Sequence, residues 1–304
     1  MVCVLMSTYN GEKYLAEQLD SILSQRGVNI KLLIRDDGSK DSTNAIIESY
    51  INNSPEIIHL HKGENVGFAK SFTLLLQMGY EMFPECEYFA FADQDDVWLE
   101  DKLYSALSKL QNKSKELPIT YCSNTTLVRK DLSVIGDCWK PQDVKLSKER
   151  ALIKSFATGC TMVFNRCAVK IYITHIPQEL KVHDFYMYQL CMFLGKVIFD
   201  EKSHILYRQH GNNQIGKKNF KEKLWNKLKY GDNSKEHVLE KQNYYLLKAL
   251  KDLLSIEDIS LISKVAFYRM NIWTRLNLLF DLRISHIRLE QEIMYLLKII
   301  KGGV

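Results

Sequence analysis

The sequence has 304 residues, of which 46% are hydrophobic and 25% are charged. This composition is typical of a globular protein with one large domain or two small ones, and it excludes a disordered chain. No run approaches the roughly 18 apolar residues that a membrane-spanning helix needs. No signal peptide precedes the first apolar segment, so we expect a cytoplasmic protein.

The seven cysteines are consistent with a reducing compartment, because they form no CxxC pair and no zinc-ligand spacing. The net charge of +5 is concentrated in residues 217–229, which begin at Lys217 and end at Lys229. This segment contains six Lys and one Glu, so the rest of the chain is neutral. A nucleic-acid enzyme usually carries a broader basic face, so we expect no nucleic acid and one local anionic partner.

Strand and helix patterns alternate through the first half of the chain. Short apolar runs predict strands at residues 2–7, 31–35, 56–61, 88–92 and 119–128. Apolar residues at helical spacing predict helices between them, at residues 15–23, 46–51, 68–82 and 99–110. This alternation predicts an α/β fold with a Rossmann-like, mostly parallel sheet and helices on both faces.

The middle of the chain, roughly residues 129–216, has a mixed pattern. Residues 159–164 and 196–200 are predicted strands, and residues 184–194 are a predicted short helix. From Phe220 onward, Leu and Ile recur at spacings of three and four, which predicts helices to the end. We therefore expect a catalytic domain at residues 1–216 and a helical C-terminal region at residues 217–304.

Three polar clusters directly follow predicted strands. Residues 8–10 follow the first strand, residues 36–37 the second, and residues 93–96 the fourth. Because the carboxyl ends of parallel strands meet at one edge, where α/β proteins bind ligands, we expect the clusters to converge.

Asp93 and Asp95 are the sharpest feature, because two carboxylates one residue apart at a strand end can share one hard cation. Mg²⁺ and Mn²⁺ prefer oxygen ligands and often complete their shell with substrate phosphates, so such a site would neutralise a diphosphate leaving group. The alternative is an Asp-rich turn that caps the next helix. The two neighbouring clusters favour the metal site.

Other positions each keep two interpretations. Asp37 could accept a hydrogen bond from a base or ribose, or could serve an Asp-Gly turn. Asp184, which follows His183, could be a general base or a helix N-cap. Arg208 and His210 suit a phosphate or a metal, or could form a surface pair. Dinucleotide, P-loop and serine-hydrolase motifs are absent from the sequence.

As an ordered set, these motifs resemble bacterial family 2 glycosyltransferases of GT-A fold, closest to the rhamnosyltransferases of cell-wall and capsular polysaccharide assembly. The resemblance covers about residues 2–216. It rests on STYNG (7–11), RDDGSKD (35–41), ENVGF (64–68), FADQDDVWLEDKL (91–103), TGCTMVFN (158–165), HDFY (183–186) and YRQHGNN (207–213). Many relatives carry Glu-Asp where this chain has His183-Asp184, which marks a branch of the family.

The resemblance implies a role for each matched residue. The nucleotide sugar would contact Thr8, Tyr9, Asn10, Asp37, Asp93, Asp96 and Arg208. Asp93 and Asp95 would hold Mg²⁺ or Mn²⁺, and His210 would help to bind the metal or the diphosphate. Asp184 would be the catalytic base of a single inverting displacement, in which the acceptor hydroxyl attacks C1 of the donor sugar.

The implied reaction moves a sugar to a saccharide or a lipid-linked oligosaccharide in cell-surface polysaccharide biosynthesis. The resemblance favours dTDP-L-rhamnose as donor, with a UDP-hexose or a UDP-N-acetylhexosamine as alternatives. A sugar nucleotidyltransferase would need a Gly-rich, basic loop where residues 8–10 stand. A non-catalytic nucleotide-sugar-binding subunit would not need Asp93, Asp95 and Asp184 together.

The basic segment 217–229 also has an apolar side, with Phe220, Leu224 and Leu228 at four-residue spacing and Trp225 beside them. A helix of this kind can lie on anionic lipid with its Lys toward the headgroups. Alternatively, the apolar residues pack on the catalytic domain and the Lys face water. We expect peripheral association with the inner face of the cell membrane.

Overall fold

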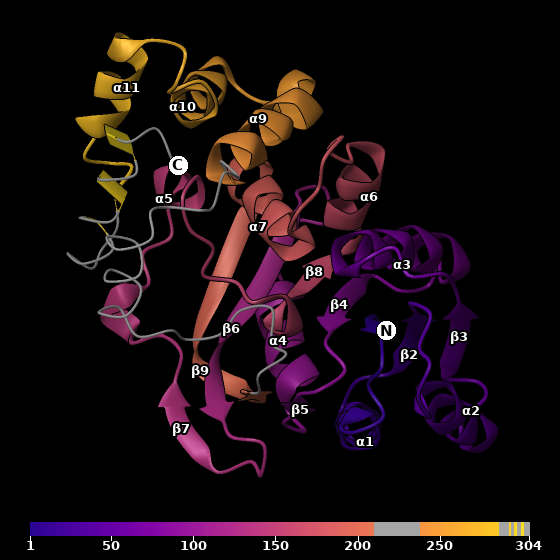
Figure 1. Ribbon diagram of the computed structural model, residues 1–304. Coiled ribbons are helices and arrows are strands. Elements are labelled where there is room, and N and C mark those ends of the chain that lie inside the picture. Colours follow the sequence, from indigo (N-terminus) through magenta and orange to yellow (C-terminus); the bar gives the residue numbers. More distant parts are fainter. Residues whose placement is uncertain (210–237, 286–291, 293–294, 297–298, 301–304) are drawn as a thin grey trace.

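The computed structural model describes residues 1–209, 238–285, 292, 295–296 and 299–300 (Figure 1). Within these residues, one nine-stranded sheet has the order β3-β2-β1-β4-β8-β6-β9-β5, and β7 pairs with β6. The strands are β1 (Val2–Thr8), β2 (Ile30–Asp36), β3 (Ile58–Lys62), β4 (Tyr88–Ala92), β5 (Val97–Trp98), β6 (Ile119–Val128), β7 (Val134–Asp137), β8 (Val163–Asn165) and β9 (Lys196–Arg208).

Helices surround this sheet. The α-helices are α1 (Leu15–Leu23), α2 (Thr43–Asn53), α3 (Phe68–Met82), α4 (Lys102–Leu110), α5 (Lys148–Ala151), α6 (Arg166–Thr174), α7 (His183–Leu194), α9 (Val238–Leu250), α10 (Ile256–Ala266) and α11 (Ile272–Leu279). Short 3₁₀ turns are η1 (Pro141–Asp143), η2 (Gly159–Thr161) and η3 (Lys251–Leu253).

The parallel half of the sheet contains β3, β2, β1 and β4. Its inner strands β1 and β4 are almost continuously apolar because helices cover both faces. Leu5 of β1 faces α3 in one core cluster, whereas Val4 faces α1 and α4 in the other. The predicted α/β fold with helices on both faces is therefore confirmed.

The second half of the sheet is mixed. β8 runs antiparallel to both β4 and β6, whereas β6 and β9 are parallel. β5, at the edge, pairs antiparallel with the end of β9. Because β5 follows β4 in the chain, this pairing places the end of β9 next to the segment after β4. The parallel and mixed halves of the sheet therefore meet beside the carboxyl end of β4.

The structure shifts several predicted boundaries. The predicted strand 159–164 divides into the η2 turn and the short β8, and the predicted strand 196–200 continues to Arg208. The helix predicted from residue 99 begins at Lys102, because residues 97–98 pair with β9. These changes share one cause. Pairing between strands that are distant in the sequence sets where these strands and the helix begin and end, and the local sequence pattern does not reveal this pairing.

The C-terminal helices pack on the sheet domain through α7. Gln189 Nε2 of α7 donates to Asn243 Oδ1 of α9 over 3.2 Å, and Asn243 Nδ2 donates to the Leu152 carbonyl over 2.8 Å. Leu246 and Ile262 belong to the same core cluster as Leu5. The predicted boundary at residue 217 lies outside the described residues.

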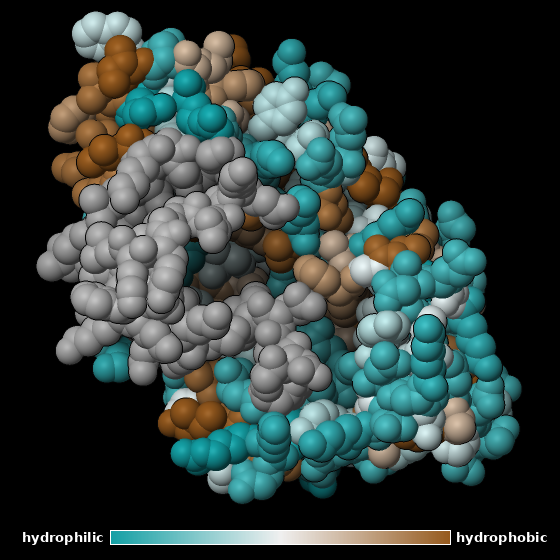
Figure 2. Space-filling view, viewed as in Figure 1, coloured by the Kyte–Doolittle hydropathy of each residue, from teal (hydrophilic) through white to brown (hydrophobic). Residues whose placement is uncertain are grey.

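The surface of the C-terminal helices carries exposed apolar side chains. Figure 2 shows hydrophobic surface at the upper left, over α11, where Met270, Trp273, Phe280 and Leu282 are exposed. No helix among the described residues is long and apolar enough to cross a bilayer.

If the C-terminal helices stabilise the sheet domain, Leu246→Ala should lower the free energy of unfolding by about 2–5 kcal/mol, because it empties a fully buried position. Denaturant unfolding followed by tryptophan fluorescence measures the change. Lys241→Ala, at an exposed position of the same helix, is the matched control. Equal stability of the two variants would mean that the helices are a separate unit.

Candidate active site

The first predicted polar cluster lies at the carboxyl end of β1, where strand register aligns Thr8 with Asp36 of β2. Thr8 Oγ1 donates to Asp36 Oδ1 over 3.0 Å. Asn10 has a positive φ of 49° and accepts from the Lys40 backbone N–H over 2.9 Å. The loops after β1 and β2 are therefore locked together.

The same loop is tied to the acidic cluster after β4. The Tyr9 N–H donates to Gln94 Oε1 over 2.9 Å, and Gln94 Nε2 donates back to the Tyr9 carbonyl over 3.1 Å. The Tyr9 ring is exposed, so it can stack on a ligand. Gln94, to which the sequence motif assigned no role, therefore links the first and third clusters.

Asp37 lies deeper than the sequence suggests. Its carboxylate pairs with Arg35 and accepts from the backbone N–H groups of Val66 and Gly67, each over 3.0 Å. Only 3% of its surface is exposed. Asp37 therefore holds the loop after β3 against the end of β2, and its contact with a base stays a prediction.

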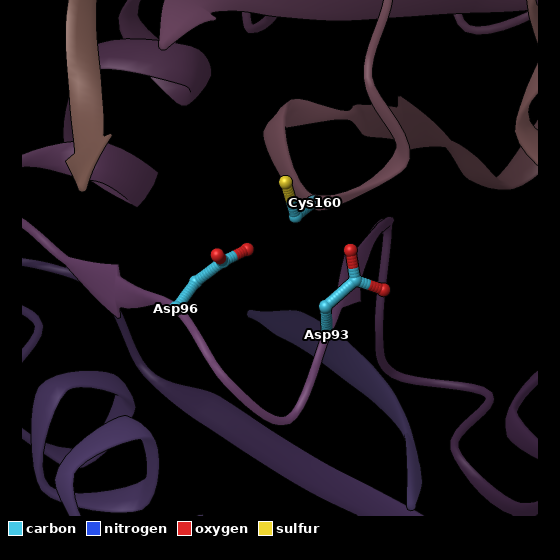
Figure 3. Close-up of side chains that lie close together, drawn as sticks. All are labelled: Asp93, Asp96 and Cys160. Atoms are coloured by element: carbon cyan, nitrogen blue, oxygen red, sulfur yellow. The ribbon is translucent and has the colours of Figure 1, made fainter. Parts of the chain in front are cut away.

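Asp93, Asp96 and Cys160 point toward one another from the segment after β4 and from η2 (Figure 3), with their potential ligand atoms all within 4.8 Å. Burial raises the pKa of Asp93 to about 7, and the negative charges of Asp95 and Asp184 add to this effect. Burial also raises the pKa of Asp96 well above its ordinary value. Removing several carboxylates from water together is costly unless a cation balances them.

This arrangement fits a hard divalent cation. Asp93 and Asp95 offer carboxylate oxygens at the strand end, and Asp96 Oδ2 is buried without a hydrogen-bond partner among the described residues. Mg²⁺ and Mn²⁺ prefer such oxygen ligands to the sulfur of Cys160, whose raised pKa keeps the thiol protonated. His210, the third predicted metal ligand, lies outside the described residues.

Lys102, at the start of α4, is a fully buried residue that the sequence analysis missed. Its ammonium lies 3.5 Å from the centre of the Trp98 ring. Burial lowers its pKa to about 7, whereas the nearby Cys160 and Asp96 act in the opposite direction. The available sequence signal was its position one turn before Ala106, on the buried side of an amphipathic helix.

Asp184 lies in the first turn of α7. Its Oδ2 accepts from the Gly159 N–H over 2.8 Å, and burial raises its pKa to about 6. Its charge also raises the pKa of Asp93, so the two carboxylates act in one electrostatic site. Val182 occupies the N-cap position, so the alternative interpretation of Asp184 as the helix N-cap is wrong.

His183 is packed among aromatic rings. It stacks on Phe72 with 4.1 Å between ring centroids and meets the edge of Phe91 at 4.8 Å. Burial lowers its pKa to about 3, so the imidazole is neutral at physiological pH. Where many relatives carry an acid, this chain therefore has an uncharged side chain that anchors the start of α7.

Arg208, the last residue of β9, is 1% exposed and faces protein groups. Its Nε donates to the Asp95 carbonyl over 2.9 Å, and its backbone N–H donates to Asp96 Oδ1 over 3.2 Å. The guanidinium also pairs with Glu17 of α1. The structure thus places Arg208 against the acidic cluster, and its contact with the nucleotide sugar stays a prediction.

The comparisons with known proteins agree with this geometry. The profile of the family described as Glycosyl transferase family 2 matches residues 3–171. The dTDP-rhamnosyl transferase RfbG of Shigella flexneri is 31% identical over 225 residues, which cover 69% of this chain and 73% of that protein.

Two solved structures share the fold at low sequence identity. Residues 1–349 of S. aureus TarS, in complex with UDP-GlcNAc, align with a TM-score of 0.59 and 17% identity, over 100% of this chain and 81% of that one. The mannosyltransferase PcManGT of Pyrobaculum calidifontis, in complex with GDP-Man and Mn²⁺, gives 0.51 and 16%, over 100% and 88%.

The fold and the site together define a glycosyltransferase of GT-A fold that acts on nucleotide sugars. This chain belongs to glycosyltransferase family 2, because the family profile matches more than half of it.

Gly159→Ala tests the contact that orients Asp184. The added methyl group would lie 3.1 Å from Asp184 Oδ2 and 3.3 Å from its Cβ, so the carboxylate must move by a few tenths of an ångström. We expect sugar transfer to fall about tenfold or more, since small misplacements of catalytic groups are costly. Kinetic assay and thermal melting measure this together. Full activity would show that Asp184 needs no fixed position.

Proposed function

We propose that this enzyme transfers L-rhamnose from dTDP-L-rhamnose, with inversion, to a saccharide or lipid-linked oligosaccharide in cell-surface polysaccharide biosynthesis. The observation that supports the transferase part is the cluster of Asp93 and Asp96 after β4, with Asp95 and Asp184 close enough to raise the pKa of Asp93. The rhamnosyl part rests on similarity to RfbG.

Asp184 suits the role of general base. A pKa of about 6 leaves its carboxylate ionised at neutral pH yet basic enough to accept a proton as the acceptor hydroxyl attacks. The Gly159 N–H fixes one oxygen of the Asp184 carboxylate. The other oxygen is oriented by the start of α7. The proton therefore moves from the acceptor hydroxyl to Asp184.

The donor occupies the edge formed by the strand ends in this proposal. Thr8, Tyr9, Asn10 and Asp37 border the nucleoside, and Asp93, Asp95 and Asp96 face the ribose and diphosphate. Asp93 and Asp95, with His210 as a further ligand, would hold Mg²⁺ or Mn²⁺, which would supply positive charge to balance the nucleoside diphosphate.

A UDP-sugar is the second candidate donor. TarS, which shares the fold, binds UDP-GlcNAc. A donor panel separates the candidates: dTDP-L-rhamnose should give at least about tenfold higher kcat/KM than UDP-glucose, UDP-galactose or UDP-GlcNAc, since one well-placed pocket contact is worth this much. Release of nucleoside diphosphate with an oligosaccharide acceptor is the measurement. Preference for a UDP-sugar would contradict rhamnosyl specificity and leave transfer intact.

We also propose that the enzyme works at the inner face of the cell membrane. The basic segment 217–229 lies outside the described residues, so its amphipathic helix remains a prediction. The exposed apolar side chains around α11, including Trp273 and Phe280, support the proposal, because such groups suit an interface with lipid.

Asp184→Asn keeps the shape of the side chain but removes its basicity. We expect turnover to fall roughly 10²–10⁴-fold, with little change in donor affinity. In the wild type, kcat/KM should rise with pH up to about 6 and level off above it, because only the ionised form accepts a proton. The variant should lack this inflection. Normal turnover in the variant would place the base elsewhere.

Asp95→Ala removes one proposed metal ligand. We expect transfer to become undetectable, and EDTA should have the same effect on the wild type until Mn²⁺ or Mg²⁺ is added back. Asp252→Ala, at an exposed carboxylate of η3, is the control and should stay fully active. Transfer that survives both Asp95→Ala and EDTA would exclude the metal role.

A further inference from the structure

Arg208 joins three segments that lie far apart in the sequence. Besides its bond to the Asp95 carbonyl, its Nη1 donates to the Lys130 carbonyl over 2.5 Å. Its Nη2 pairs with Glu17, and the guanidinium carbon lies 4.5 Å from the centre of the Tyr14 ring. One planar group thus connects the acidic loop, the turn after β6, and α1.

The backbone of the acidic loop, residues 93–96, is held at two carbonyls. Gln18 Nε2 of α1 donates to the Asp93 carbonyl over 2.8 Å, and Arg208 Nε donates to the Asp95 carbonyl over 2.9 Å. These bonds fix the direction of the two carbonyls, and with them the backbone that carries the side chains of Asp93 and Asp95. The loop is held in this way despite the mutual repulsion of its carboxylates.

We propose that Arg208 is a positioning residue, which fixes the acidic loop in the conformation that binds the metal, and does not itself contact the donor phosphates. This inference rests on the proposed metal role of Asp93 and Asp95. A guanidinium can make these diverging contacts at once because it is planar, whereas the compact ammonium of Lys cannot. We therefore expect the planar shape of the Arg208 side chain to matter more than its charge for holding the acidic loop.

Arg166 is a matched control. Its guanidinium donates to the carbonyls of Tyr80, Phe83 and Cys86 over 2.6, 3.1 and 3.3 Å, and it stacks on the Tyr80 ring at 4.0 Å. It shares with Arg208 the bonds to backbone carbonyls and the contact with a tyrosine ring, although it is only partly buried. It lies at the opposite end of β4, however, beside Tyr88, so its loss should reduce stability without affecting the metal.

The experiment measures Mn²⁺ binding without turnover, by the electron paramagnetic resonance signal of free Mn²⁺. Arg208→Lys and Arg208→Met should each weaken Mn²⁺ binding about tenfold or more, the usual effect of losing a residue that orients metal ligands. Arg166→Lys and Arg166→Met should bind Mn²⁺ like the wild type. Glu17→Gln removes the negative charge that pairs with Arg208, at a half-exposed position, and should weaken Mn²⁺ binding by a smaller factor. This variant tests the inference if the Arg208 variants do not fold.

The other outcomes overturn the inference in distinct ways. Unchanged Mn²⁺ affinity with weaker dTDP or UDP binding at saturating Mn²⁺ would make Arg208 a phosphate ligand. Equal weakening by the Arg166 variants would reduce the effect to a general loss of rigidity. Rescue by Arg208→Lys would show that charge alone suffices. A wild type that binds no Mn²⁺ would contradict the proposed metal site itself, and this inference with it.

Discussion

The electrostatic repulsion among Asp93, Asp95, Asp96 and Asp184 is the constraint on which the rest of this structure depends. Burial raises the pKa values of Asp93, Asp96 and Asp184, and the negative charges of neighbouring carboxylates add to this effect at Asp93 and Asp96. A chain can keep such a group together only if the surrounding fold is rigid and if a cation completes it. The nearly continuous apolar strands β1, β2 and β4 supply the rigidity, because their loops have little freedom beyond the last buried residue.

Contacts from several directions offset the repulsion among these carboxylates. Backbone N–H groups at Gly159 and Arg208 donate to Asp184 and Asp96, and the buried Lys102 lies behind the cluster. Second contacts of this kind orient the groups that would hold a metal.

The sequence predicted the parts of the site that follow from local pattern. Runs such as residues 88–92 end directly in acidic residues, and parallel strands bring such ends together, so the convergence of Thr8 with the acidic loop could be foreseen. The surroundings of Arg208 and Lys102 could not, because burial depends on which segments pair across the chain. The long β9 illustrates this: polar residues interrupt its apolar pattern, and pairing with β6 and β5 extends it to Arg208.

The first turn and the middle of helix α7 make different contacts, which affects the design of hybrid enzymes. Its first turn carries Asp184, and its middle is bonded through Gln189 to Asn243 of the C-terminal helices. In a hybrid enzyme that exchanges only the C-terminal helices, Gln189 would therefore lose its matched partner. The mismatch would lie on the helix that carries the proposed base. Such hybrids should therefore exchange α7 and α9 together, as a single unit.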